Sequence, residues 1–131
     1  MIAGIGTDVC SIERIGKSLE RFGDRLVRRI LTPQERPRFQ RTRDKAGHLA
    51  KRFAAKEAFS KALGTGIRYP VNWHNVWVEN APSGKPSLKF SRPLAALLRR
   101  RGISCVHLSL TDEVGMAGAF VLVEGKAGKT R

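Results

Sequence analysis

KRFAAKEAFSKALGTG, residues 51–66, is the stretch that decides the fold. Its apolar side chains spread around most of the circumference of a helix: Phe53, Ala54, Ala58, Phe59, Ala62 and Leu63. That distribution is typical of a helix covered on several sides. We therefore predict a long central helix that begins near Asp44 and ends at Leu63, with the rest of the chain packed around it.

Two charged residues of this helix need an explanation. Glu57 and Lys61 lie on one stripe, flanked by small residues that let a backbone or a ligand approach closely: Ala50, Ala54 and Ala58. A carboxylate and an ammonium group in that setting need partners, because burying an uncompensated charge costs several kcal/mol. The alternative is an ordinary surface ion pair, which contributes about 0.3 to 0.5 kcal/mol.

The surroundings of this pair favour a ligand. Arg52 and Lys56 are like charges four residues apart, and they repel each other mildly unless an anion lies between them. Gly64-Thr65-Gly66 ends the helix with residues that tolerate left-handed backbone and leave amide groups open. Together these features indicate a site for a phosphate ester with a divalent cation.

The composition indicates one globular domain with an acidic partner. The 131 residues suffice for a single core, and 41% hydrophobic with 27% charged residues is ordinary. The charge is not ordinary: 25 Lys and Arg against 11 Asp and Glu give +14. Nucleic acid, an anionic membrane surface or an acidic protein would all suit that charge. With neither a leader-like N-terminus nor an apolar run of about 20 residues, we expect a cytoplasmic protein.

The cysteines and histidines give little sign of chemistry. Cys10 and Cys105 form neither a CxxC motif nor a Cys/His pairing at the usual metal spacing, so we expect both thiols to pack in the core. His107 shares one face of an expected strand, 104–111, with Ser109 and Thr111. We expect a hydrogen-bonded structural histidine there, the alternative being a base.

The N-terminal region combines a strand with a basic helix. Residues 2–9 are typical of a strand that carries Gly4 and Gly6 on one face, where something can pack closely. Asp8, at the end of this expected strand, either projects toward a ligand or serves as a turn or cap acid. Ser11 is a plausible N-cap for a helix whose core face is Ile12, Ile15, Leu19 and Phe22 and whose basic row is Arg14, Lys17, Arg21 and Arg25. That row invites an acidic partner.

The remaining segments alternate between helices and strands. Residues 32–35, TPQE, have the pattern of a capping box, and Pro37 limits the following helix to a short turn through Phe39, followed by a basic loop. A hairpin is expected over 76–79 and 87–90, a helix from Pro93 to Gly102, and strands over 104–111 and 116–123. We expect a single domain over residues 1–124 and a basic, flexible tail over 125–131.

Four motifs together resemble a known family. GIGTDVCSIERI at 4–15, RFAAKEAFSKALGTGI at 52–67, GKP at 84–86 and HLSLTDE at 107–113 are similar to those of the holo-[acyl-carrier-protein] synthases, the small bacterial class of 4'-phosphopantetheinyl transferases. The resemblance implies an α+β fold with a small antiparallel sheet packed on a long central helix, assembled as a homotrimer. It also implies transfer of phosphopantetheine from coenzyme A to a serine of apo-acyl carrier protein in fatty acid biosynthesis.

The resemblance also implies roles for individual residues. The family's Mg²⁺ ligands fall on Asp8 and Glu57, with Lys61 beside the phosphates. Coenzyme A would be held by Arg52, Gly64, Thr65, Gly66, Lys85 and Pro86 as well as Lys61. Arg14 and Arg21 would meet the acidic carrier protein.

The general base and one competing function stay open at this stage. Glu57, a metal-bound water and Asp112 are the candidate bases, and Asp112 stands where many relatives have histidine. The competing function is a basic RNA- or ribosome-binding module. The charge suits it, but the chain has no RNP or zinc-knuckle motif, so we expect neither a nucleic acid nor a membrane as partner.

Overall fold

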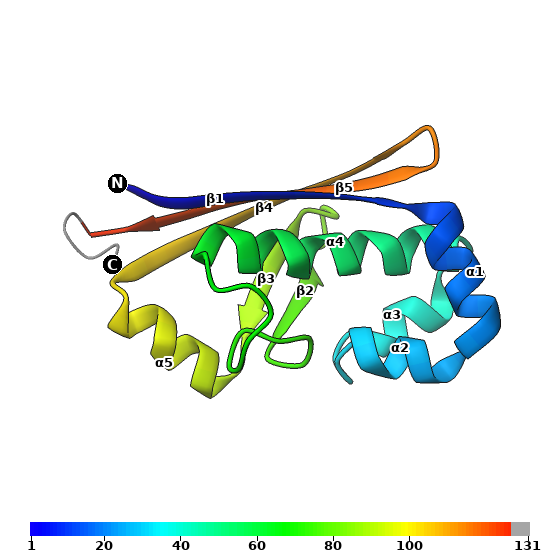
Figure 1. Ribbon diagram of the computed structural model, residues 1–131, viewed down its shortest axis with the longest axis horizontal. Helices are drawn as coiled ribbons and strands as arrows, with labels where there is room; N and C mark the ends of the chain where they lie inside the picture. The colour runs from blue at the N-terminus through cyan, green and yellow to red at the C-terminus, as the bar shows by residue number, and fades with distance from the viewer. Residues whose placement is uncertain (127–131) are drawn as a thin grey trace.

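The computed structural model describes residues 1–126, and the helix α4 (Lys45–Leu63) runs along its middle. The long strands lie along one side of α4, and the helices formed by residues 12–22, 24–30 and 36–41 gather around its N-terminal end (Figure 1). Asp44 caps the helix by accepting a hydrogen bond of 3.0 Å from the amide of Gly47, and Gly64 ends it in a left-handed conformation. The prediction of a central helix covered on several sides is confirmed.

A three-stranded antiparallel sheet covers one side of α4. It consists of β1 (Ile2–Ser11), β5 (Met116–Gly125) and β4 (Ile103–Glu113), in that order across the sheet. A Cβ atom added to Gly4 would overlap the carbonyl oxygen of Ala62, and one added to Gly6 would overlap that of Ala58. Both glycines are therefore required for β1 to lie directly against α4, as their shared face predicted.

A second, smaller sheet and one helix complete the main core. The predicted hairpin is formed by β2 (Val76–Asn80) and β3 (Pro86–Phe90), and α5 (Arg92–Arg100) buries Leu94 and Leu98. These side chains pack with residues of α4 and β5, among them Phe59, Val121 and Val123. The structure is therefore an α+β fold in which antiparallel sheets pack on a long helix.

Three short helices form a second core at the other end of the molecule. They are α1 (Ile12–Phe22), α2 (Asp24–Ile30) and α3 (Arg36–Arg41), and their cluster is built from Val27, Ile30, Leu31, Phe39 and Leu49. Ser11 caps α1 as predicted. The expected core face of α1 is partly wrong, because no residue of α1 is fully buried and Phe22 remains 41% exposed.

Several element boundaries differ from the sequence expectation. Residues 33–35 form a turn and α3 begins only at Arg36, because the carboxylate of Glu35 is drawn into the protein interior. The last strand passes the predicted end and includes Glu124 and Gly125, and the amide of Lys126 still donates to the carbonyl of Gly102. The rest of the predicted tail, 127–131, lies outside the described residues.

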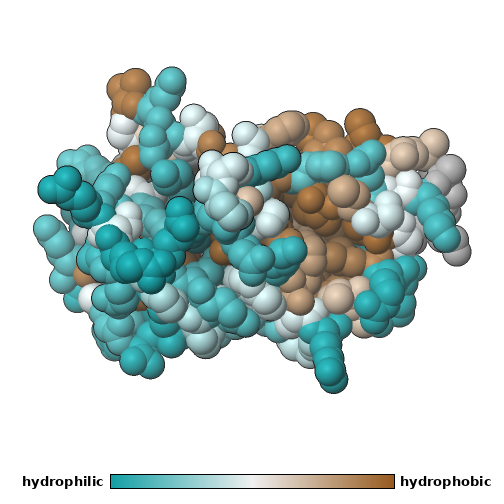
Figure 2. Space-filling model, turned by 180° about the vertical axis from the view of Figure 1, so that it is seen from behind, coloured by the Kyte–Doolittle hydropathy of each residue, from teal (hydrophilic) through white to brown (hydrophobic). Residues whose placement is uncertain are grey.

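The hydropathy of the surface differs between the two ends of the molecule on the face seen in Figure 2. Figure 2 shows hydrophobic residues gathered toward the end that holds the chain termini, while the end that holds α1–α3 is largely hydrophilic. Among the described residues, no helix combines the length and the apolar character needed to span a bilayer.

Candidate active site

Asp8, Glu57 and Lys61 come together where β1 crosses α4. Asp8 belongs to the face of β1 that contacts the helix, between Gly6, which packs on Ala58, and Cys10, whose thiol lies 3.4 Å from the carbonyl oxygen of Ala50. The Nζ of Lys61 donates to Oδ1 of Asp8 at 3.1 Å and to the carbonyl of Thr7 at 3.2 Å. A strand carboxylate and a helix ammonium far apart in sequence thus form one site.

Glu57 is the third member of this site, and its environment disfavours a negative charge. Partial burial raises the pKa of Glu57, the nearby carboxylate of Asp8 raises it further, and Lys61 opposes both effects. Two carboxylates this close need a cation, and oxygen ligands suit a hard divalent ion. The donor set of Asp8 and Glu57 therefore fits Mg²⁺.

A basic cavity lies on the opposite side of α4. Arg52 is about 140° around the helix from Glu57 and roughly 180° from Lys61. It opens into a cavity of about 580 Å³ whose walls come from α3, α4, the β2–β3 hairpin and the end of β4. The cationic and imidazole side chains around this cavity are Arg38, His48, Lys51 and Arg52.

The charges around this cavity are not fully balanced within the chain. The Arg52 side chain is 4% exposed, and burial lowers its pKa to about 10, an effect that the Glu35 carboxylate opposes. Its Nη2 donates to Oδ1 of Asn80 at 2.8 Å, but its buried Nε has no partner among the described residues. Burial and the neighbouring cations lower the pKa of His48 to about 3, so His48 is neutral at physiological pH. The cavity therefore offers buried donors to an anion.

The turn between β2 and β3 closes one wall of the cavity. Gly84 and Pro86 line it, and the Nδ2 of Asn80 holds the turn by donating to the carbonyl of Gly84 at 3.0 Å. Lys85 lies at this turn and its side chain is exposed. Three residues that the family resemblance marks for coenzyme A, namely Arg52, Lys85 and Pro86, are thus brought to one place.

Gly64, Thr65 and Gly66 do not have the open amides that the sequence suggested. The amide of Gly64 donates to the carbonyl of Lys61, and the amides of Thr65 and Gly66 donate to that of Ser60. These bonds satisfy the carbonyl end of α4, which also carries the negative end of the helix dipole. The prediction that these amides are left open is therefore wrong.

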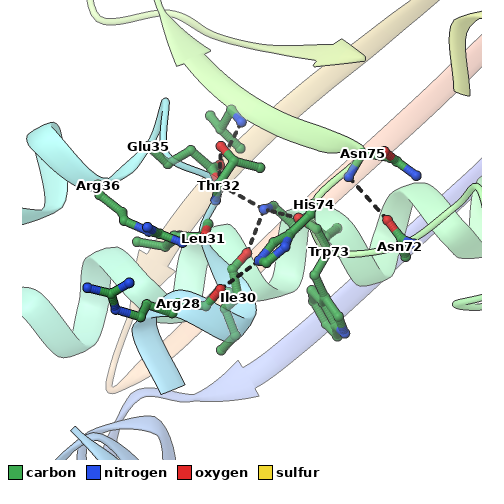
Figure 3. A network of polar contacts seen from close by, with 12 residues as sticks. Arg28, Ile30, Leu31, Thr32, Glu35, Arg36, Asn72, Trp73, His74 and Asn75 are labelled. Atoms are coloured by element: carbon green, nitrogen blue, oxygen red, sulfur yellow. Dashed lines mark hydrogen bonds and ion pairs between the residues drawn. The ribbon is translucent and has the colours of Figure 1, made fainter. Parts of the chain in front are cut away.

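Lys56 faces the interior of the protein, whereas the sequence predicted that it shares a bound anion with Arg52. Its Nζ donates to Oε1 of Glu35 at 2.7 Å and to the carbonyls of Ile30 and Trp73, and both charged side chains are fully buried. Figure 3 shows Glu35 reaching inward to join this network. The other Glu35 oxygen accepts from the amide of Val78 at 2.8 Å. The anion expected near Arg52 and Lys56 is therefore a carboxylate of the same chain.

The two arginines predicted to meet a partner lie on the exposed side of α1. Arg14 borders a mostly apolar cavity of about 530 Å³ that includes Val9 and Cys10, next to Asp8 in the chain. The Arg21 guanidinium lies over the ring of Phe22, 5.2 Å from its centroid. Within residues 1–126, neither Arg14 nor Arg21 has a carboxylate within 4.0 Å. Both cations are therefore available to an acidic surface.

Asp112 lies away from the acidic site within one chain. Its carboxylate pairs with Lys51 at 3.0 Å, beside the basic cavity. Asp112 is on β4, and β5 separates that strand from β1. Adjacent strands are about 4.8 Å apart, so the site at Asp8 is out of reach of Asp112 of the same chain.

Comparison with known proteins agrees with this geometry. The family model of the 4'-phosphopantetheinyl transferase superfamily matches residues 4–115. A holo-[acyl-carrier-protein] synthase of Aromatoleum aromaticum is 53% identical over 124 residues, which cover 95% of this chain and 98% of the relative.

Solved structures give the same result. The crystal structure of a holo-[acyl-carrier-protein] synthase from Neisseria meningitidis has a TM-score of 0.91 at 45% identity, covering 95% of this chain and 99% of that one. One from Bacillus anthracis, described as a complex with CoA (3',5'-ADP), has a TM-score of 0.79 at 38% identity, covering 96% and 99%. The chain therefore belongs to the holo-[acyl-carrier-protein] synthases, within the 4'-phosphopantetheinyl transferase superfamily.

Proposed function

We propose that this protein transfers 4'-phosphopantetheine from coenzyme A to a serine of apo-acyl carrier protein and releases adenosine 3',5'-bisphosphate. The observation that carries the proposal is the meeting of Asp8, Glu57 and Lys61 at the contact of β1 with α4. Two carboxylates and one ammonium group are the parts needed to hold a metal-bound diphosphate and to move one proton.

The acidic site prepares the reaction at phosphorus. Mg²⁺ bound by Asp8 and Glu57 would neutralise the diphosphate and polarise the phosphorus under attack. Lys61 has a side chain that is 53% exposed and can turn from Asp8 toward the bridging oxygen as the bond to the bisphosphate breaks. There its charge favours the departing oxygen, and its ammonium group can supply a proton.

Glu57 is our choice of general base, with a metal-bound water as the alternative. The serine oxygen forms a bond to phosphorus while its proton passes to the base. Partial burial and the neighbouring Asp8 raise the pKa of Glu57, which makes its carboxylate a stronger base than an ordinary glutamate. Asp112 of the same chain is paired with Lys51 on another strand, which disfavours it.

The basic cavity is suited to the adenosine bisphosphate part of coenzyme A. Arg52 and Lys85 supply cations, and Pro86 an apolar wall. A bound phosphate would provide a partner for the buried Nε of Arg52. Gly64, Thr65 and Gly66 keep only a role by proximity to Lys61, because their amides are already used.

The separation of these two regions supports a homotrimer with its sites between subunits. The acidic site is at the β1 edge of the sheet and the basic cavity is at the β4 edge, so one coenzyme molecule would be held by two copies of the chain. The outer face of the sheet is apolar enough for such an assembly: Ile5, Val9, Met116 and Phe120 remain 59%, 60%, 40% and 43% exposed.

The exposed arginines of α1 are suited to an acidic carrier protein. Arg14 is close in the chain to Asp8 and borders the apolar cavity beside β1, so a carrier docked on α1 would hold its serine near the acidic site. The net charge of +14 would speed the encounter with an acidic partner.

A mass measurement tests the proposal. The protein is incubated with apo-acyl carrier protein, coenzyme A and Mg²⁺, and the carrier is weighed by mass spectrometry. We expect the carrier to gain one phosphopantetheine, and we expect no gain when Mg²⁺ is chelated. An unchanged carrier together with tight, salt-sensitive RNA binding would instead favour the RNA-binding alternative.

A further inference from the structure

Cys105, His107 and Glu124 form a compact group outside the proposed active site. Cys105 and His107 are two residues apart on β4, and Glu124 is paired with Cys105 across the neighbouring strand β5. Their ligand atoms all lie within 4.8 Å of one another. The sequence expectation that Cys105 packs in the core is wrong, because this thiol is exposed.

The contacts in this group converge on a single nitrogen atom. The Nε2 of His107 lies 3.3 Å from Sγ of Cys105 and 2.6 Å from Oε1 of Glu124. A nucleophile–base–acid triad needs the two ring nitrogens to face different partners, so that one receives the thiol proton while the other is held by the acid. Here both partners face the same nitrogen, so the group is not built as a catalytic triad.

The distances are close to those required by a bound metal ion. Zinc bonds to sulfur, nitrogen and oxygen at 2.0 to 2.3 Å, which places the ligand atoms of a tetrahedral site roughly 3.3 to 3.6 Å apart. The Sγ to Nε2 distance of 3.3 Å already agrees. The Nε2 to Oε1 distance would have to open by less than about 1 Å, and the side chains of both residues are partly exposed and can rotate.

The chemistry of the three ligands selects the class of metal. Mg²⁺ and Ca²⁺ prefer sites made entirely of oxygen, such as Asp8 with Glu57, and do not use a thiolate. A thiolate, an imidazole and a carboxylate together suit a borderline ion such as Zn²⁺. Three protein ligands leave the fourth position open to water.

The geometry points to a second, separate metal site that binds Zn²⁺ through Cys105, His107 and Glu124 on the outer face of the sheet. The ion connects β4 to β5 close to the point where Gly125 bonds to Met1 and where the sheet ends. Because the sheet itself lies between this outer face and α4, the ion takes no part in phosphoryl transfer.

Titration with Co²⁺ as a spectroscopic probe tests this site. The reduced, metal-stripped whole protein is titrated while Mg²⁺ in excess keeps the acidic site filled. We expect one Co²⁺ per chain, with a thiolate-to-cobalt charge-transfer band in the near ultraviolet and the strong visible bands of four-coordinate cobalt. Zn²⁺ should then displace the cobalt and bleach these bands, and it should raise the melting temperature.

Matched variants separate this site from the other thiol and from the acidic site. Loss of a residue that only supports a metal ligand costs 10- to 100-fold in affinity, so Cys105→Ser and His107→Gln should each weaken binding at least about 100-fold. Cys10→Ser keeps the hydrogen-bonding hydroxyl at the other cysteine and should retain the full spectrum, as should Glu57→Gln. Circular dichroism confirms that each variant is folded.

Three results would overturn the site. The first is a wild-type protein that gives no thiolate band at any Co²⁺ concentration up to precipitation, since the group would then be only an ion pair with a thiol beside it. The second is a Cys105→Ser protein that binds as tightly as wild type. The third is a band that disappears in Cys10→Ser.

Discussion

Glu57 is a carboxylate in a place that makes its charge unfavourable until a cation arrives. We predict that Glu57→Gln abolishes turnover, because Glu57 is both a proposed metal ligand and the proposed base. The same change should raise the melting temperature of the metal-free protein by less than about 5 °C. The pKa of Glu57 is raised in the folded state above the ordinary 4.5. The charged carboxylate of Glu57 therefore lowers the free energy of unfolding fully above that folded pKa and has no such effect below pH 4.5.

Paired thermal melts at several pH values measure this effect. In the absence of Mg²⁺ the variant should melt higher than wild type at neutral pH, and the two curves should merge as the pH falls below 4.5, where the glutamate is protonated in both states. A lower melting temperature for the variant at neutral pH would mean that the attraction between Lys61 and this carboxylate is stronger than the combined effects of burial and of repulsion by Asp8. Full activity in the variant would remove Glu57 from the reaction.

Lys56 contributes stability from inside the protein. We predict that Lys56→Met lowers the free energy of unfolding by about 3 to 5 kcal/mol, because it leaves the fully buried carboxylate of Glu35 without its cation. Lys61→Met is the matched control on the same helix, and it should cost less than about 1 kcal/mol since that lysine is 53% exposed. Urea denaturation measures both, and equal losses would contradict the account.

At this scale the sequence identified charges well and their partners poorly. Glu57 and Lys61 could be chosen because a helical stripe of small residues made their charges conspicuous, whereas Asp8 was singled out as a metal ligand only by the family resemblance. Lys56 could not be distinguished from them, because its partner Glu35 lies 21 residues away. The capping-box pattern accounted for only one bond of Glu35, the one that its carboxylate accepts from the amide of Thr32 at 2.9 Å. Cys105 and His107 are two residues apart on a strand of correctly predicted alternation, but the strand predicted over 116–123 ended one residue before Glu124.

The contact of β1 with α4 is the element on which the acidic site depends. We predict that Gly6→Ala lowers the free energy of unfolding by about 3 kcal/mol, because a methyl group would push β1 away from the backbone of α4. The same shift would move Asp8 away from Glu57, so the catalytic rate should fall as well. Gly16→Ala is the control, since the added carbon would lie an ordinary 3.5 Å from Ala46. Denaturation and steady-state rates test this, and equal stability of both variants would contradict it.

The basic side of α1 provides a second test at the scale of an element. We predict that Arg14→Glu raises the KM for acyl carrier protein on the order of tenfold and changes no other kinetic constant. The substitution reverses a charge that, in our proposal, contacts only the carrier protein. The KM for coenzyme A should stay the same. Arg100→Glu changes the net charge equally at the far end of the molecule (Figure 1) and should leave both constants near wild type. Equal effects of the two variants would mean that α1 acts only through its contribution to the net charge and is not a docking surface.

Elements whose local signals and tertiary contacts agree were predicted nearly to the residue. Asp44 and Gly64 bound α4 as expected because the cap and the left-handed glycine are local signals. The helix after residue 32 started late, since Glu35 bonds to Val78, on a strand distant in sequence. The strand β5 is longer than predicted, because pairing with β1 and β4 on both sides extends it through residues of low strand propensity.

The two halves of the proposed site lie on opposite sides of α4, and this arrangement governs the whole molecule. A single chain holds the carboxylates that we propose as metal ligands at the β1 edge and the cavity that we propose for the phosphates at the β4 edge. Neither the helical spacing nor the composition could reveal this, because the order of strands in the sheet depends on long-range pairing. An assembly around the exposed apolar face of the sheet would bring the β1 edge of one copy to the β4 edge of the next.

Mixing two inactive variants tests whether the site is shared between copies. Glu57→Gln removes the acidic half and Arg52→Met the basic half, each at nearly constant volume. If one site uses Glu57 of one copy and Arg52 of the next, every mixed trimer contains one intact site, and random mixing of equal amounts should restore roughly a quarter of the wild-type rate. The proteins are unfolded together, refolded and assayed for carrier modification, with each variant refolded alone as the control. A mixture as inactive as its components, at a trimeric mass confirmed by sedimentation, would place both halves of the site in one chain.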